Sequence, residues 1–208
     1  MMSRTRATES VSPGDNVLLL CPVFDPADSV ACVDLLTVEE PSQENILSVT
    51  ITRSPQTRLA IWEQYADETP AAASIIGFEE STPSADAFVG DNSGQTEIDI
   101  DLTVSSVSDV SDLGVEIVEQ IDQWLASAGD RRTVVCFHSV SALLELVGLT
   151  ESFRFLSTVA QRCRSAGAIA HYHMDPRAHD EQTVERFQRV FDVVYEYDDG
   201  AWSRKALA

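Results

Sequence analysis

Short apolar runs alternate with helical segments along most of this chain. The first run, Asn16–Cys21, contains four consecutive aliphatic residues and is followed by Asp25-Pro26. That pair is typical of a helix start, because Asp caps the first turn and Pro occupies its first position. Further apolar runs lie at 46–52, 74–78, 132–138, 168–175 and 191–198. Continuous apolar runs are typical of strands buried on both faces of a parallel sheet. The alternation therefore predicts an α/β fold, with a mainly parallel sheet and helices on both faces.

The helical segments between these runs differ in how clearly they are marked. The clearest helix is predicted over 112–127, with Gly129 as its C-cap. Its apolar face is predicted to comprise Val115, Val118, Ile121 and Leu125. Further helices are predicted after Ser54 and over 139–147, 150–165 and 178–190.

The domain organisation follows from length and composition. A chain of 208 residues can bury one substantial core but is short for two. Residues 1–14 are polar and are predicted to form a flexible tail before a single domain over 15–208. Residues 79–95 are rich in turn formers and are predicted to be a loop insertion, with a short strand at 86–89. The segment 97–104 alternates apolar and polar residues, which favours a strand with one wet face.

The charge is strongly one-sided, with 14 basic and 34 acidic residues giving a net charge of -20. Thirteen of the basic residues are arginine, and Lys205 is the one lysine. An acidic surplus almost without lysine is expected for a protein of a salt-loving archaeon, where molar salt shortens the Debye length to about 3 Å and weakens self-repulsion. Nucleic-acid binding is disfavoured, because that function needs a stripe of basic residues.

The sequence also bears on location and on the state of the cysteines. No apolar run reaches the length of a membrane span, and the N-terminus lacks the apolar core of a secretory signal. A cytoplasmic protein without membrane contact is predicted. The cysteines form no CxxC motif and are predicted to be reduced core residues rather than a zinc cluster or a disulfide framework. They are Cys21, Cys32, Cys136 and Cys163.

Three segments carry a resemblance to a known family. Thr133–Leu146 (TVVCFHSVSALLEL), Phe153–Leu156 and Gly167–Asp180 (GAIAHYHMDPRAHD) together resemble the RecA/KaiC-like ATPase fold, and in particular small haloarchaeal KaiC-like proteins. The resemblance covers about residues 15–200. It implies a three-layer core of the P-loop NTPase type and a nucleotide site built from three motifs.

The phosphate-binding loop implied by the resemblance is degenerate. A working loop follows the first strand as GxxxxGK[ST], with glycines that let the backbone wrap phosphates and a lysine that reaches them. The segment Cys21–Ser29 contains neither glycine nor lysine. Pro22 and Pro26 remove two backbone donors, and Asp25 occupies the helix N-terminus that should attract the anion. Asp28 and Ser29 complete the degenerate segment.

The other two nucleotide motifs are also missing. Where an active relative has an aspartate at the end of its Walker-B strand, this strand ends in His138, followed by Ser139. Neutral imidazole is a poor ligand for Mg²⁺. Thr52 and Arg53 stand where the resemblance places catalytic glutamates, and Glu79-Glu80 are interpreted as solvated loop charges. The sequence therefore predicts no ATP hydrolysis and no bound ATP or magnesium.

Histidines and aspartates concentrate in one segment near the C-terminus. His171, His173 and Asp175 alternate along a predicted strand, and His179 follows closely. The HxHxD pattern is shared with metal-dependent hydrolases, so these residues are candidate metal ligands. A RecA-type sheet is the wrong context for that motif, and Pro176 stands in place of the final histidine. The favoured interpretation is structural: the rings pack under a helix, satisfied by backbone or by Asp175, which caps the next helix.

These observations lead to three functional hypotheses. The first is a non-catalytic RecA/KaiC-like module that regulates or binds a protein partner, either an active relative or a second copy of itself. The second is a metal-dependent enzyme or metal site at the histidine-rich segment. The third is a nucleotide binder without hydrolysis.

Overall fold

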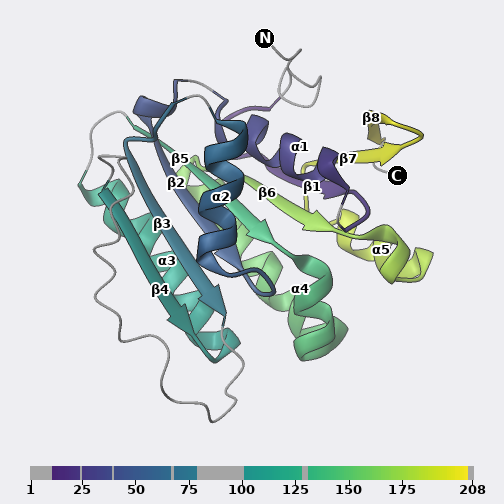
Figure 1. The fold of residues 1–208 in the computed structure, drawn as a ribbon. Helices are drawn as coiled ribbons and strands as arrows, with labels where there is room; N and C mark the ends of the chain where they lie inside the picture. The colour runs from purple at the N-terminus through teal and green to yellow at the C-terminus, as the bar shows by residue number, and fades with distance from the viewer. Residues whose placement is uncertain are drawn as a thin grey trace.

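A single mostly parallel sheet runs through the molecule (Figure 1). The computed structural model describes residues 11–23, 25–38, 40–66, 68–78, 101–127 and 131–205. The eight strands have the order β4-β3-β2-β5-β6-β1-β7-β8, and only the β7–β8 pair is antiparallel. The strands are β1 Asn16–Leu20, β2 Glu44–Thr50, β3 Ala72–Phe78, β4 Asp101–Val107, β5 Arg132–His138, β6 Ile169–Met174, β7 Val193–Asp198 and β8 Ala201–Lys205.

Helices cover both faces of this sheet, which gives a three-layer α/β fold of the RecA-like type. They are α1 Pro26–Leu36, α2 Pro55–Tyr65, α3 Val110–Ala126, α4 Val140–Ala166 and α5 Glu181–Gln188, with short 3-10 turns η2 Pro41–Gln43 and η3 Pro176–Ala178. Residues from α1 pack with alternate residues of the central strands on one face. Residues from α3, α4 and α5 pack with the other alternate residues on the opposite face. The predicted fold class is confirmed.

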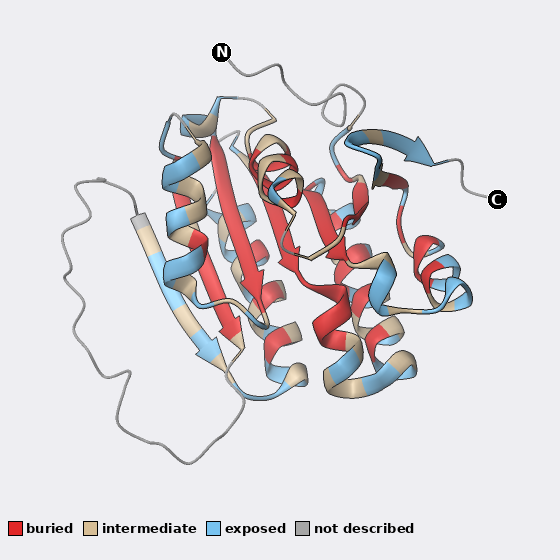
Figure 2. Ribbon diagram, turned by 45° about the vertical axis from the view of Figure 1, so that its right-hand side comes forward, coloured by how far each residue is buried: buried red, intermediate tan, exposed pale blue. Residues whose placement is uncertain are grey.

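The central strands are buried on both faces, and this explains their continuous apolar sequence (Figure 2). In β1, Val17 and Leu19 face α1, whereas Leu18 and Leu20 join the core under α4. The edge strand β4 is different, since its Val104 is 50% exposed. It runs to Val107, beyond the predicted end.

The predicted apolar face of α3 is confirmed at Ile121 but is wrong at two other positions. Val115 is 54% exposed and Leu125 is 44% exposed. The fully buried residues are Leu113, Ile117 and Ile121, which repeat every four residues along one side. The prediction began its stripe at the wrong residue, because valines and leucines occur on both sides of this helix. The predicted C-cap Gly129, the strand at 86–89 and the insertion at 79–95 lie outside the described residues.

The helix after β5 combines two predicted segments. Gly148 interrupts α4 with a φ of 73°, a conformation that glycine adopts without steric cost. The helical stretches on either side match the predicted 139–147 and 150–165. At the C-terminal end, the last predicted helix is shorter than expected, because Asp180 rather than Asp175 caps α5.

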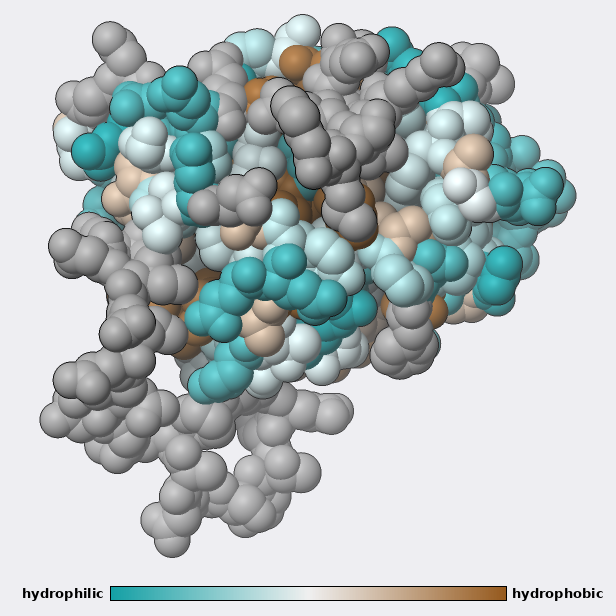
Figure 3. All heavy atoms as spheres, turned by 45° about the horizontal axis from the view of Figure 1, so that its top comes forward, coloured by the Kyte–Doolittle hydropathy of each residue, from teal (hydrophilic) through white to brown (hydrophobic). Residues whose placement is uncertain are grey.

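The visible surface is predominantly hydrophilic. Figure 3 shows one face, where teal and pale residues dominate and hydrophobic residues show in small areas between them. Among the helices that the structure describes, none combines the length and the apolar composition needed to cross a membrane.

Candidate functional site

The candidate site lies where the carboxyl ends of the central parallel strands meet the start of α1. The register aligns Thr50 of β2 with His138 of β5, and His138 with His173 of β6. β1 ends on the other side of β6, so α1 begins directly above these residues. Open α/β sheets bind ligands at this edge.

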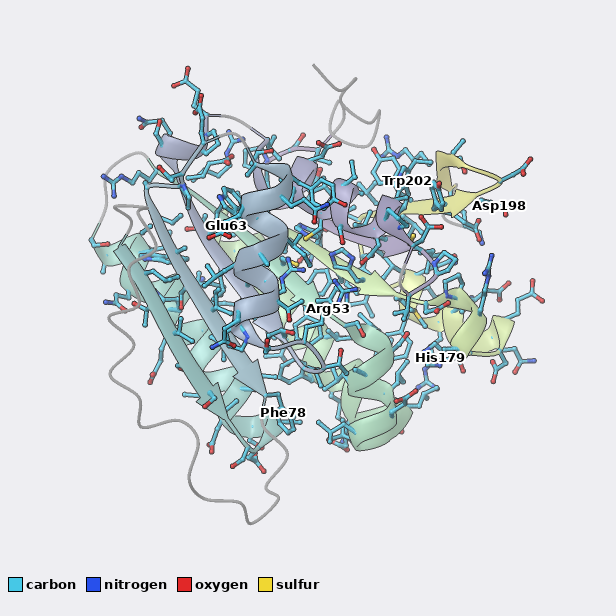
Figure 4. All side chains as sticks on the ribbon, viewed as in Figure 1. Arg53, Glu63, Phe78, His179, Asp198 and Trp202 are labelled. Carbon is cyan, nitrogen blue, oxygen red and sulfur yellow. The ribbon has the colours of Figure 1, made fainter. Side chains whose placement is uncertain are left out.

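Asp28 is the centre of a buried polar network. It lies in the first turn of α1 and is 4% exposed. Its Oδ1 lies 2.5 Å from His173 Nδ1, and its Oδ2 lies 3.4 Å from His138 Nε2. Arg53, labelled in Figure 4, comes from the connection between β2 and α2 and brings a guanidinium nitrogen 3.9 Å from the same Oδ2. The carboxylate is therefore surrounded by three basic side chains.

Burial and charge act in opposite directions on this network. Burial favours the neutral form of Asp28, but the charge of His173 and hydrogen bonds from both histidines outweigh it and hold the pKa of the carboxyl well below its usual range. Burial would lower the pKa of His173, yet the Asp28 carboxylate raises that pKa to about 9. His138 is different: burial dominates and lowers its pKa to about 4. One charged pair, Asp28 with His173, thus sits beside a neutral imidazole.

The backbone amides at the degenerate phosphate loop are already occupied. Val23 N donates to Asp175 Oδ2 at 2.9 Å, and Ala27 N donates to Asp25 Oδ1 at 2.9 Å. Asp28 N donates to the Asp25 carbonyl. The N-cap role predicted for Asp25 is confirmed. A phosphate at this position would have to displace two carboxylates from these donors.

Some of the remaining predicted motif positions have structural partners as well. Cys21 is buried, and burial raises the pKa of its thiol to about 12. Its amide donates to the Met174 carbonyl. Ser139 caps α4 by accepting from Ala142 N, and Thr50 Oγ1 donates to the Arg53 carbonyl. Pro22 and Ser29 are half-buried beside this network, Thr52 is exposed, and Glu79-Glu80 lie outside the described residues.

A second cluster lies next to Asp28, under α1. Cys32 Sγ lies 3.4 Å from Cys136 Sγ and 3.3 Å from His171 Nε2. Cys136 Sγ lies 3.6 Å from His173 Nε2. One guanidinium nitrogen of Arg58 contacts both sulfurs, at 3.0 and 3.4 Å. The two cysteines and His171 are fully buried, and His173 is 2% exposed.

The pKa values of the two thiols are shifted in opposite directions. Burial alone would raise the pKa of Cys32, but a hydrogen bond from Cys136 and the charge of Arg58 hold it well below its ordinary value. The pKa of Cys136 is raised well above its ordinary value by burial and then by the neighbouring Cys32. The Arg58 guanidinium is held in its charged form, because the sulfur charge outweighs the burial that would lower its pKa.

The structure brings together two of the four predicted metal candidates and separates the others. His171 and His173 point to the same face of β6, as the alternation predicted. Asp175 instead accepts hydrogen bonds from Val23 N and Arg177 N, and it caps η3. His179 bonds Ser141 Oγ at 2.9 Å and is labelled apart from Arg53 in Figure 4. The prediction that backbone groups or Asp175 would bond the histidine rings is wrong too, because the rings contact Asp28 and the cysteines instead.

Sequence reasoning missed Cys32, Cys136 and Arg58 as partners of the histidines. These residues are 26 to 139 positions apart from their contacts along the chain. The usable signal was strand alternation: Cys136 shares a side of β5 with His138, and the register pairs it with His171. The placement of Cys32 additionally required the packing of α1 on the sheet.

A pocket opens beside this cluster, between α1, α2 and the strands β2 and β3. Its lining is mostly apolar and includes Trp62, Leu36 and Ile75. Arg58 also lines the pocket, so one side chain contacts both the pocket and the two sulfurs.

The fold has a relative among solved structures. A protein of Pyrococcus horikoshii OT3, determined in a structural study, is similar with a TM-score of 0.60 and 14% sequence identity. The similarity covers 98% of this chain and 92% of that chain. At this identity the likeness concerns the fold alone. No curated protein matches this chain.

Membership of a family rests on sequence. The model for a family of unknown function, DUF7504, matches residues 14–197. Because that match spans most of the chain, the protein belongs to the DUF7504 family.

Proposed function

We propose that this protein is a non-hydrolysing RecA/KaiC-like domain that acts as a regulatory or protein-binding module in the cytoplasm of a haloarchaeon. The observation that carries the proposal is the occupation of the helix α1 N-terminus by the protein's own carboxylates. The Asp25 carboxylate accepts a hydrogen bond from the amide of Ala27, and the Asp175 carboxylate accepts one from the amide of Val23. These are the donors that a phosphate would need.

Electrostatics support the same proposal. Asp28 is buried and ionised in the first turn of α1, and its charge is matched by His173 and Arg53 within the protein. A nucleotide would bring further negative charge to a chain whose net charge is already -20. The segment Cys21–Ser29 contains no lysine that could compensate the charge of the nucleotide.

The proposal of a protein partner is based on the loss of the nucleotide motifs and not on a particular surface of the structure. A RecA-like domain that no longer turns over ATP keeps the sheet and helices through which such domains associate, and this is an argument from fold analogy. The partner is either a second copy or an active RecA/KaiC-like relative. Light scattering coupled to size exclusion in molar KCl distinguishes self-association, and a pull-down from native high-salt lysate identifies another partner.

Nucleotide binding is tested directly by thermal unfolding with and without millimolar ATP and magnesium in molar KCl. A ligand present at 100 times its Kd stabilises a protein by about 2.7 kcal/mol, so binding would raise the midpoint visibly. We expect no shift, and no phosphate release above a protein-free control. A reproducible shift without phosphate release would replace this proposal with the alternative of a nucleotide binder, and turnover would make the protein an enzyme.

A further inference from the structure

We propose that Cys32, Cys136, His171 and His173 form a closed four-ligand site for a divalent metal ion of the zinc class. The inference is independent of the proposed function, since it concerns the cluster under α1 and not the phosphate loop. It also differs from the metal site predicted from sequence, because Asp175 and His179 have no part in it.

The spacing of the four donor atoms fits tetrahedral coordination. Each of the four residues offers one donor atom, a cysteine Sγ or a histidine ring nitrogen, and these four atoms all lie within 4.8 Å of one another. Zn–S bonds of about 2.3 Å and Zn–N bonds of about 2.0–2.1 Å imply donor-to-donor edges of roughly 3.3–3.8 Å. Three edges of the cluster measure 3.3, 3.4 and 3.6 Å. A metal ion would require only small adjustments of the side chains.

The donor set matches a structural zinc site in kind and in charge. Two thiolates and two imidazoles form one of the common closed ligand sets for zinc. Two thiolates also cancel the charge of a divalent ion, which matters because the ligands are almost entirely shielded from solvent. Arg58 donates to both sulfurs and would stabilise them as thiolates.

The surroundings of His173 support metal ligation through Nε2. Its Nδ1 lies 2.5 Å from Asp28 Oδ1, while its Nε2 faces Cys136. A carboxylate on the far nitrogen of a metal-binding histidine orients the ring and fixes its tautomer. His171 lacks this support, because its Nδ1 has no hydrogen-bond partner among the described residues.

An alternative set, Asp28 with His138 and His173, is less suitable. Its donor atoms also lie within 4.8 Å of one another. However, Asp28 Oδ1 and His173 Nδ1 are 2.5 Å apart, which is a direct hydrogen bond and shorter than the edge between two ligands of one zinc ion. Asp28 therefore supports the proposed site from outside.

A closed site predicts a structural role. With four protein ligands the ion has no open position for water or substrate, unlike a catalytic zinc. The ion would join α1 to β5 and β6 across the layer between helix and sheet. Arg58, which contacts both sulfurs, is the residue that this site shares with the neighbouring pocket.

The test is metal analysis of protein purified under reducing conditions without chelators, from cells grown with added zinc. We expect about one zinc per chain by mass spectrometry of the metal. Exchange with Co²⁺ should give the visible bands of tetrahedral cobalt and the near-ultraviolet charge-transfer band of thiolate ligands. A strong thiol reagent should release the zinc stoichiometrically.

Cys32→Ser and Cys136→Ser should each lose the metal, whereas Cys163→Ser should retain it. Cys163 is an equally buried free cysteine that packs against Tyr172 on the other face. Because a ligand variant can also fail to fold, the cobalt titration of the wild-type protein stands as a separate readout. Substoichiometric metal with no cobalt spectrum would overturn the proposal, as would a Cys32–Cys136 disulfide found by mass under native conditions. Full metal retention in both ligand variants would place the ion elsewhere and would also overturn it.

Discussion

The central strands β5 and β6 present very different side chains to the two faces of the sheet. Toward α3 and α4 they turn apolar residues such as Phe137 and Tyr172, which belong to the largest core cluster. Toward α1 they turn Cys136, His138, His171 and His173. Both faces are buried. The layer toward α3 and α4 is apolar, whereas the layer toward α1, called the polar layer below, combines these polar side chains with apolar ones such as Val134 and Ile169.

This difference indicates that different interactions stabilise the two layers. The apolar layer is stabilised by contact area and close packing, so its residues can be exchanged at a cost set by volume. The polar layer depends on specific partners, because a buried charge that loses its partner is costly. Tyr172 shows the boundary between the two: its ring packs against Phe137 and Phe191, and its hydroxyl donates to Asn16 Oδ1 at 3.0 Å.

The largest effect is expected from Asp28→Asn on the polar face. The substitution preserves size but removes the charge opposite His173, and breaking one side of a buried ion pair costs about 3–5 kcal/mol. Denaturant unfolding in molar KCl measures the loss. Asp180→Asn is the control, since that residue is an exposed N-cap of α5 and keeps a side-chain oxygen as acceptor. A loss no greater for Asp28→Asn than for the control would contradict the paired polar layer.

A smaller but clear effect is expected on the apolar face. Ile117→Ala should lower the free energy of unfolding by about 2–5 kcal/mol, because this residue of α3 is fully buried against the core. Val115→Ala, two positions away on the same helix, should change it by less than about 0.5 kcal/mol, since that side chain is half exposed. A larger loss at Val115 than at Ile117 would mean that α3 packs with the register expected from the sequence.

This pair of positions shows what the sequence could and could not reveal about the fold. The strands were predictable, because apolar runs such as Asn16–Cys21 leave few alternatives to burial on both faces. Helix caps such as Asp25 were predictable from local chemistry. The buried side of α3 was not, because Val115 and Ile117 are similar in hydrophobicity and only packing against the sheet distinguishes them.

The candidate site was less predictable than the fold. His171 and His173 were found, because residues two apart on a strand share a side. Their partners Cys32 and Asp28 come from a helix near the N-terminus, and no local pattern indicates that this helix lies over β6. Asp175 was assigned to the histidines for its closeness in sequence, but its carboxylate faces Val23 N instead.

Salt concentration should affect the repulsion between surface charges much more than the buried interactions of the polar layer. Lowering KCl from molar to about 0.1 M lengthens the Debye length from about 3 to about 10 Å, so repulsion within a chain of net charge -20 should reduce overall stability. The cost of Asp28→Asn should change little across the molar range, because buried pairs are screened less than exposed ones. Urea midpoints across a KCl series, with and without the substitution, measure both effects. A cost that fades as salt rises would mean that water reaches Asp28.

The smallest effect is expected at an exposed ion pair on α4. Arg154 and Glu151 lie 2.9 Å apart, but their side chains are 71% and 60% exposed. Water and salt screen such a pair, and holding two long side chains in one geometry costs entropy, so Arg154→Gln should change stability by no more than about 0.5 kcal/mol. Chemical denaturation in molar KCl, analysed beside Asp28→Asn, tests this. A large loss at Arg154 would show that exposed ion pairs contribute substantially to the stability of this protein. The buried contacts on the two faces of the sheet would then account for a smaller share of its stability.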